Sequence, residues 1–235
     1  MKKMKIRNQF IIVILIAIIF CAIFAVYTSD MGSEDNGNNV SFVIDEDDVS
    51  ICQAEKFERA AMSSYDARAD LFVKKALSND DCDGDSVSTL DNCLQALRDR
   101  CPSGTDFTSF VLSYLQENFK YVSDQELYSS FDWAAYPIET LSLKDGDCED
   151  FVILFVALLE RGGYDCGIAL FHDHAVAMVA VECDTSSSVG GFSPMYVEYG
   201  GQTYYAFETT EICPPGYTFE EYYSADILSF KMVSA

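Results

Sequence analysis

The residue best placed to do chemistry is Cys148, in the stretch Asp147-Cys148-Glu149-Asp150 that runs straight into an apolar segment. That segment, 151–159, has too few polar positions for a surface helix. The sequence therefore predicts a buried helix that begins near Cys148 with Asp147 as its N-cap. A thiol at a helix N-terminus has its thiolate stabilised, and the thiolate is the nucleophilic form. Glu149 and Asp150 oppose that stabilisation, so a nucleophilic Cys148 needs a cationic partner.

A thiol nucleophile also needs a base within hydrogen-bond reach, and the base needs a group that orients it. The chain contains two histidines, His172 and His174, at the start of a predicted strand that follows the Cys148 helix. The helix, loop and strand between Cys148 and these histidines are long enough for the chain to turn back, so that the sheet edge lies over the N-terminus of the helix. An imidazolium placed there would lower the pKa of the thiol. The competing interpretation is an inert buried cysteine with two structural histidines.

The elements that must position these residues follow from the periodicity of the chain. Apolar residues at three-four spacing predict helices over about 50–77, over 89–100 and from Phe107 to Phe119. Ser103 and Asp106 form an S-x-x-D capping signal before the third helix. Residues 120–144 show no regular period. The Cys148 helix should end at Gly162 or Gly163, which can supply a left-handed residue.

After that helix the apolar period changes to two, which is typical of strands. A pair of runs joined by Gly200-Gly201 predicts a hairpin. The expected strands cover 166–171, 174–181, 195–199, 202–207 and a late segment at 227–233. Helices first and antiparallel strands afterwards is the order of an α+β fold.

The N-terminal part predicts a membrane anchor and a linker. Residues 1–9 are basic, 10–27 are apolar without a charge, and 28–48 are rich in Gly, Asn, Ser and acids. An uncharged run of this length is close to the roughly 20 residues of a membrane span. The segment 28–48 is typical of a flexible acidic stalk. The positive-inside rule then predicts a single-pass cell-membrane protein with its N-terminus in the cytoplasm and the rest outside. A cleaved signal peptide is the alternative.

Charge excludes one class of partner. The chain carries a net charge of −23 with a pI near 4.1, and such a field repels nucleic acid. It attracts cations, and the segment 79–84 matches the first half of a calcium loop, but Leu90 stands where that loop needs Glu. We therefore expect a solvated acidic turn there and no cofactor, with calcium as the alternative.

Nine cysteines are present, and eight of them follow the apolar segment: 52, 82, 93, 101, 148, 166, 183 and 213. An extracellular setting permits disulfides. Cys82 with Cys93 and Cys52 with Cys101 are natural pairs, although sequence alone does not give connectivity. An even number of external cysteines also counts against a free thiol at Cys148.

Four segments together resemble the transglutaminase-like superfamily, particularly the microbial branch that includes transglutaminase-like cysteine peptidases. They are Tyr-Pro-Ile-Glu-Thr-Leu (136–141), Gly-Asp-Cys-Glu-Asp (146–150), His-Ala-Val-Ala-Met-Val (174–179) and Tyr-Tyr-Ala-Phe-Glu-Thr-Thr (204–210). The resemblance covers about 105–212. It implies a papain-like core of helices packed on an antiparallel sheet, in a domain over 105–235 that follows a helical part over 49–104.

The resemblance also implies roles for individual residues. Cys148 is the nucleophile and His174 the general base. Glu208 is the orienting acid where the family has Asp, with Asp184 and Glu198 as the alternatives. The oxyanion donors would be the Cys148 backbone N–H and an upstream side chain, for which the indole of Trp133 is a candidate. His172 shares a face with His174 and could line the site.

These residues predict a membrane-anchored extracellular cysteine peptidase or amidase that acts on a peptide or protein substrate through a thioester. The second hypothesis is a catalytically inactive surface binding module, favoured by the Glu at 208 and by the even cysteine count. The third is a zinc site made of Cys148, His172 and His174. The sequence does not separate hydrolysis from transamidation.

Overall fold

The structure of the protein is a computed structural model that describes residues 40–42, 44, 64–78, 88–129, 133–183 and 188–234. These residues belong to one compact unit that begins at Val40. The predicted anchor over 10–27, most of the stalk and the first half of the first helix lie outside the described residues. Within the described part, no helix has the length and apolar character needed to cross a membrane.

The helices that surround the site begin and end close to the predicted positions. The helix expected over 89–100 is confirmed as α4. The third helix begins one residue after Asp106, whose carboxylate accepts a hydrogen bond from the Ser109 N–H at 2.8 Å. The cap is therefore Asp106, and the prediction that Ser103 serves as the cap was wrong. The α-helices are α3 (Tyr65–Ala76), α4 (Thr89–Arg100), α5 (Phe107–Asn118), α6 (Asp124–Leu127), α7 (Pro137–Leu143) and α8 (Cys148–Arg161).

The region 120–144, for which the sequence indicated no regular structure, contains short elements. Strand β1 (Lys120–Tyr121) pairs in parallel with β2 (Asp145–Gly146), immediately before α8. Helix α7 starts with Pro137 at its first position, and the Glu139 carboxylate accepts from the Tyr136 N–H at 2.7 Å. These elements are too short to show a period, which is why the pattern missed them.

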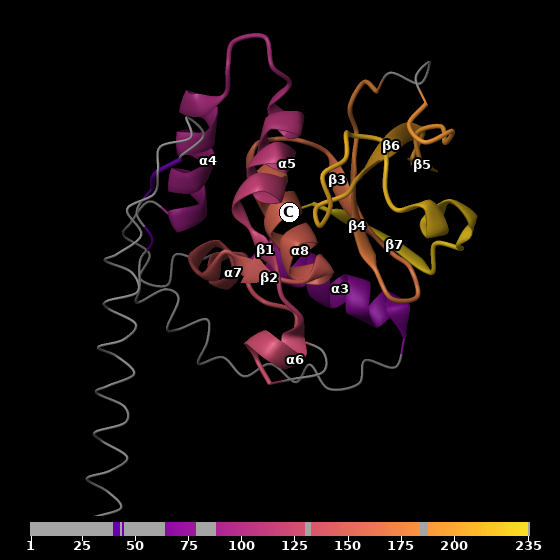
Figure 1. Cartoon of the computed structure of the whole chain (residues 1–235), viewed down its shortest axis with the longest axis horizontal. Coiled ribbons are helices and arrows are strands. Elements are labelled where there is room, and N and C mark those ends of the chain that lie inside the picture. The colour runs from indigo at the N-terminus through magenta and orange to yellow at the C-terminus, as the bar shows by residue number, and fades with distance from the viewer. Residues whose placement is uncertain are drawn as a thin grey trace, which may run out of the picture. The chain divides into compact units, whose positions relative to one another are not determined.

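The five predicted strands form one antiparallel sheet in the order β5-β6-β4-β3-β7 (Figure 1). The hairpin β5–β6 turns at Gly200-Gly201, both at positive φ, as its glycines predicted. Phe207, the last residue of β6, pairs with Ala177 in the middle of β4. The residue after β6 therefore lies beside the first half of β4. The strands are β3 (Cys166–Leu170), β4 (Ala175–Val179), β5 (Tyr196–Tyr199), β6 (Gln202–Phe207) and β7 (Ser229–Val233).

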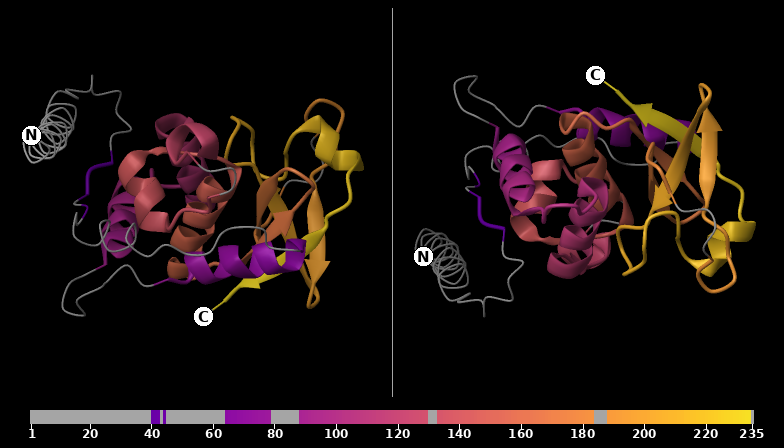
Figure 2. Two further views of the ribbon diagram at one scale, coloured as in Figure 1. Left: turned by 90° about the horizontal axis from the view of Figure 1, so that it is seen from below. Right: turned by 90° about the horizontal axis from the view of Figure 1, so that it is seen from above.

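Helix α8 is the centre of the core. Every residue from Cys148 to Leu159 is buried, because α8 packs against the sheet and against α3, α4, α5 and α7. Seen from above and below, these helices lie on one side of the sheet, with α3 running beside β7 (Figure 2). The rings of Phe155 and Phe207 join helix to sheet, with centroids 5.6 Å apart. The predicted α+β class is confirmed: helices pack on an antiparallel sheet.

The six cysteines within the described residues, at 93, 101, 148, 166, 183 and 213, are not joined in disulfides. The proposed pairs Cys82–Cys93 and Cys52–Cys101 are therefore not formed in this structure, and Cys52 and Cys82 themselves lie outside the described residues. Cys93 and Cys166 are buried, and burial raises the pKa of each of these thiols to about 12. They are inert core residues.

Candidate active site

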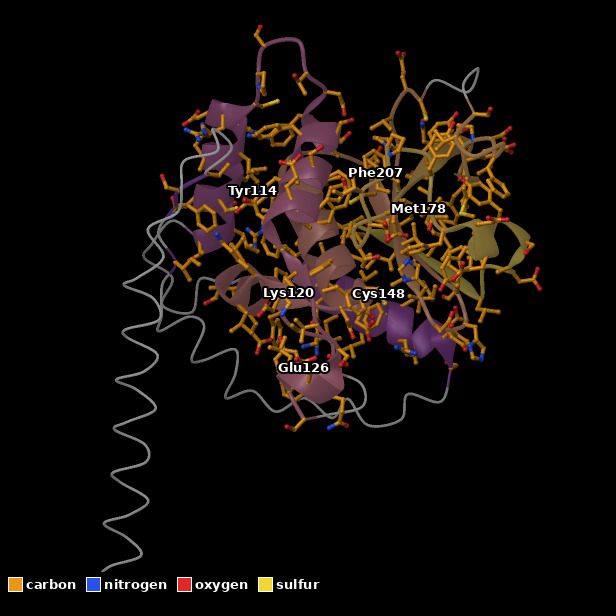
Figure 3. The ribbon with its side chains drawn as sticks, in the orientation of Figure 1. Tyr114, Lys120, Glu126, Cys148, Met178 and Phe207 are labelled. Carbon is orange, nitrogen blue, oxygen red and sulfur yellow. The ribbon has the colours of Figure 1, made fainter. Side chains whose placement is uncertain are left out.

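Cys148 is the first residue of α8 and is only 7% exposed. Figure 3 shows it where α8 approaches α3. Asp147 occupies the N-cap position as predicted, but its side chain makes no capping hydrogen bond. The Asp147 carboxyl instead shares a hydrogen bond with Glu149. The capping role predicted for the Asp147 side chain was wrong because this neighbouring acid competes for it.

The thiol of Cys148 is protonated in this arrangement. Its Sγ donates to Glu149 Oε2 at 3.0 Å. Burial, and then the charges of Glu149 and Asp147, raise the pKa of the Cys148 thiol well above its ordinary value, while a hydrogen bond from the Ala175 N–H acts in the opposite direction. Helix α3 supplies a cation beside this carboxylate, since Arg68 lies 3.5 Å from Glu149 Oε1.

His174 and Glu208 form a buried pair. His174 stands immediately before β4 and Glu208 immediately after β6, and the antiparallel pairing of those strands brings them together. His174 Nε2 lies 2.8 Å from Glu208 Oε2, and Glu208 is fully buried. With Nε2–H donated to the carboxylate, Nδ1 is the nitrogen left to accept a proton. A thiol base needs that tautomer.

Hydroxyl groups hold Glu208 in its charged form. Thr210 donates its N–H and its hydroxyl to Oε1 at 3.0 and 2.6 Å, and Thr218 donates to Oε2 at 2.7 Å. Burial alone would raise the pKa of Glu208. The bond to His174 and the threonine hydroxyls outweigh burial and lower that pKa below its ordinary value. A Glu at this position therefore orients the imidazole as an Asp would.

Cys148 and His174 line one cavity of about 200 Å³, which we call the thiol cavity. The residue after His174 is Ala175, whose N–H bonds the thiol. The imidazole is held on its face as well as at its edge. Tyr222 stacks on it with centroids 4.8 Å apart and an angle of 15°, and Phe219 meets it edge-on at 5.4 Å. The site thus gathers a helix-terminal thiol, an oriented imidazole and a buried carboxylate.

The other predicted site residues lie elsewhere. His172 is exposed, and its backbone carbonyl accepts from the Tyr65 hydroxyl at 3.2 Å. Trp133 packs on Tyr128 with ring centroids 5.3 Å apart and is not among the residues that line the thiol cavity. Of the alternative acids, Glu198 is exposed on β5, while Asp184 lies outside the described residues.

Tyr121 is a site residue that the sequence did not indicate. The β1–β2 pairing sets it opposite Gly146, two residues before Cys148, and it lines the thiol cavity. Burial, and then the charges of Cys148 and Asp147, raise the pKa of the Tyr121 phenol to about 12, so it remains a hydrogen-bond donor at neutral pH. No local pattern predicts a strand of two residues, so no sequence signal could have found it.

A cluster of buried carboxyl groups lies next to the Cys148 thiol. Oxygen atoms of Asp124, Asp147 and Asp150 lie within 4.8 Å of one another, and Asp147, Cys148 and Glu149 form a second such group. Asp147 Oδ1 and Asp150 Oδ2 have no hydrogen-bond partner within the described residues. Burial and mutual repulsion raise the pKa of Asp147 to about 10. An all-oxygen set of this kind suits a hard cation such as Ca²⁺.

Neither histidine belongs to the metal-ligand groups found in the described part of the chain. The geometry therefore gives no support to the zinc site considered for Cys148, His172 and His174. The half calcium loop at 79–84 lies outside the described residues.

Comparisons with known proteins add little to this geometry. No family model and no curated protein matches the chain. Among solved structures, it is similar to a candidate cysteine protease from Cytophaga hutchinsonii, with 14% sequence identity and a TM-score of 0.34. The match covers 78% of this chain, which spans 57% of that protein. A likeness at this level carries no argument about function, so the function is inferred from the site itself.

Proposed function

We propose that the protein is a cysteine hydrolase that cleaves peptide or carboxamide bonds through a thioester. Cys148 is the nucleophile, His174 the general base and Glu208 the acid that orients the base. The observation that carries this proposal is the imidazole of His174, which is joined to the buried Glu208 at 2.8 Å and lines the same cavity as the thiol at the N-terminus of α8. This is the nucleophile, base and orienter arrangement that acyl transfer requires.

The reaction starts by moving the thiol proton. In the resting arrangement the Cys148 thiol donates to Glu149, so its side chain must turn from Glu149 to Nδ1 of His174. Nδ1 takes the proton, and the thiolate attacks the carbonyl carbon of the substrate. The backbone N–H of Cys148, in the first turn of α8 where no intrahelical acceptor exists, can donate to the oxyanion. The Tyr121 hydroxyl is the second candidate donor.

Acyl transfer is completed in two further steps. The imidazolium of His174 gives its proton to the leaving amine as the C–N bond breaks, which leaves a thioester on Cys148. His174 then takes a proton from water, the resulting hydroxide attacks the thioester, and the carboxylic acid leaves as the thiol regains its proton. Glu208 stays ionised throughout and stabilises the imidazolium in both steps.

The sequence motifs also indicate a superfamily for the protein, and its N-terminal segment indicates where the protein is located. The four motifs around Cys148, His174 and Glu208 support membership of the transglutaminase-like superfamily. The uncharged segment 10–27, with bases before it and acids after it, supports a membrane anchor that holds the catalytic domain outside the cell. A protease-accessibility assay on intact cells would test the orientation.

The test uses two histidines that differ in burial. Full-length protein, purified in detergent because of the segment 10–27, is incubated with a proteome-derived peptide mixture, and new termini are identified by mass spectrometry. We expect cleavage by the wild type and by His172→Ala, and none by Cys148→Ala or His174→Ala. Cleavage that persists in Cys148→Ala would overturn the assignment.

The second candidate function is a binding module without catalysis. The high pKa of the Cys148 thiol and its bond to Glu149 favour this alternative, because a thiol held in this way is a poor nucleophile. It predicts the same alkylation rate of Cys148 by iodoacetamide in the wild type and in His174→Ala. A catalytic site predicts slower alkylation in the variant.

A further inference from the structure

A second cavity adjoins the thiol cavity and shares His174, Tyr121 and Asp173 with it. It has a volume of about 410 Å³, and we call it the histidine cavity. His174 lines both cavities, whereas Cys148 lines only the thiol cavity. The histidine cavity is lined by Tyr121, Asp173, His174, Thr210, Glu211, Phe219, Glu221 and Tyr222.

The position of this cavity follows from the proposed mechanism. The acyl part of the substrate is bonded to Cys148 and must occupy the thiol cavity. The leaving amine takes its proton from His174, so the chain that departs with this amine lies against the imidazole. A cavity lined by His174 and not by Cys148 is therefore where the leaving part of the substrate fits.

The walls of the histidine cavity have the chemistry of a cation site. Asp173, Glu211 and Glu221 contribute three exposed carboxylates, and neither lysine nor arginine is among the lining residues. The rings of Tyr222 and Phe219 stand together at the imidazole, with centroids 6.1 Å apart. Aromatic faces and carboxylates both attract an ammonium or guanidinium group, and the apolar stem of a long side chain packs on the rings.

The position of Tyr222 is itself fixed by one of these acids. The Tyr222 hydroxyl donates to Asp173 Oδ1 at 3.1 Å, which ties the segment carrying Phe219 and Tyr222 to the residue before His174. The aromatic wall is thus held beside the catalytic base before any substrate binds. A preformed wall of this kind loses little entropy on binding.

We propose that the histidine cavity binds a lysine or arginine side chain in the part of the substrate that leaves with the amine. This assignment rests on the proposed function for the roles of Cys148 and His174. It makes Glu211 and Glu221 specificity-determining residues, since both carboxylates stand at this cavity and neither has a place in the acyl-transfer steps. The substrate class is then a peptide with a basic residue just after the cleaved bond.

Binding of product-like dipeptides tests the proposal without relying on catalysis. Lys-Ala-amide and Gln-Ala-amide are titrated into full-length Cys148→Ala protein, followed by saturation-transfer NMR in 150 mM salt, which screens charges beyond about 8 Å. We expect the lysine dipeptide to bind about tenfold more tightly, the combined effect of the carboxylates and rings. Equal binding of the two dipeptides overturns the proposal.

Matched variants distinguish the effect of the carboxylates in the cavity from the effect of the overall negative charge of the protein. Glu220 is exposed and adjacent to Glu221, but it does not line the cavity. We expect the lysine preference to disappear in Glu211→Gln/Glu221→Gln and to remain in Glu220→Gln. A preference that survives in the double variant belongs to the overall charge and overturns the proposal.

Cleavage sites distinguish failure of this inference from failure of the proposed function. In the peptide mixture, wild-type protein should leave new N-termini enriched in Lys and Arg at the first or second position. Cleavage without that enrichment overturns the inference and leaves the proposed function in place. Selective binding of the lysine dipeptide without any cleavage supports the cation site and overturns the proposed function.

Discussion

After burial, the charge of Glu149 is the main reason why the pKa of the Cys148 thiol is raised. The carboxylate of Glu149 accepts a hydrogen bond from the thiol, with Sγ 3.0 Å from Oε2, and its other oxygen lies 3.5 Å from Arg68. A carboxylate next to a thiol disfavours the thiolate. Arg68 offsets part of that charge from α3, but the pKa of the thiol still lies well above its ordinary value.

Replacing Glu149 with Gln should therefore make Cys148 more reactive. The substitution removes a like charge beside the thiol and the negative charge that faces Arg68, and both effects lower the thiol pKa. At pH 7.5 we expect iodoacetamide to alkylate Cys148 about tenfold faster, which corresponds to a fall of one pKa unit. Peptide mass spectrometry measures the rate, and Glu160→Gln at the far end of α8 is the control. Equal rates in the two variants would show that burial alone sets the reactivity.

Glu208 should affect both catalysis and acid stability. Glu208→Gln keeps the shape but loses the charge that stabilises the imidazolium, so we expect peptide cleavage to slow by about a hundredfold or more. The pKa of Glu208 is lowered by folding, so its stabilising effect is complete above pH 4.5 and is lost as the pH falls below that value.

Urea unfolding from pH 3 to 7 measures that acid dependence. The wild type should lose stability on the acid side, while Glu208→Gln should show a flatter curve. The exposed Glu198→Gln on β5 is the control and should follow the wild type. A variant curve with the wild-type slope would mean that Glu208 is not charged in the folded protein.

The sequence motifs pointed to Cys148, His174 and Glu208, and the structure places His174 beside Glu208 and in one cavity with Cys148, but the sequence did not indicate the residues around them. Cys148, His174 and Glu208 stand in recognisable motifs. Tyr121 and Tyr222 do not, because Tyr121 lies on a strand of two residues and Tyr222 lies on a 3₁₀ helix (Glu220–Ser224) that brings its ring onto His174. Such contacts are tertiary, and no local period encodes them.

At the scale of elements, Gly146 decides how α8 begins. A Cβ at this position would lie 2.8 Å from Asp150 Cβ and 3.1 Å from Phe151 Cε1. The glycine therefore lets β2 approach the first turn of α8 closely. That approach brings β1, with Tyr121, close to Cys148.

Gly146→Ala should consequently displace the start of α8. We expect a loss of about 1–3 kcal/mol in the free energy of unfolding, because backbone and a packed ring must shift. Cleavage should fall by more than the folded fraction does, since Cys148 and Tyr121 move apart. Thermal unfolding and peptide cleavage are measured together. Asp145→Ala, the neighbouring position on β2, is the control, and equal effects in the two variants would contradict this role for Gly146.

The elements that the sequence predicted are those long enough to repeat their apolar pattern several times. Helices α4, α5 and α8 and the strands of the sheet were expected within a few residues of their bounds, because each buries one periodic face. Helices α6 and α7 and the pair β1–β2 were not expected. Their conformations come from proline, capping and pairing across the site rather than from a repeated apolar pattern.

At the scale of the whole molecule, an acidic chain has buried part of its charge. The net charge is −23, yet Asp124, Asp147 and Asp150 lie together in the core. Close carboxylates in a low dielectric cannot all ionise. The folded protein must hold protons, or a cation, where the unfolded chain holds neither.

This arrangement predicts that the protein becomes less stable as the pH rises. Folding raises the pKa of Asp147 from 3.8 to about 10 and that of Asp150 well above 3.8. Between about pH 4 and 10 the folded state binds more protons than the unfolded state, so the free energy of unfolding falls with pH. In EDTA, we expect Tm to decrease from pH 5 to pH 9, by about 2–4 °C for each kcal/mol lost.

Asp150→Asn isolates the contribution of the carboxyl cluster. The amide oxygen can still accept from the Ala135 N–H, which Asp150 Oδ1 binds at 2.6 Å, while the charge is removed. The variant should therefore show a flatter dependence of Tm on pH than the wild type. Added CaCl₂ should raise the wild-type Tm more at pH 8 than at pH 5, because the cation replaces protons, and it should raise that of Asp150→Asn less. A wild-type slope in the variant would show that the alkaline destabilisation arises from the overall charge instead of from this cluster.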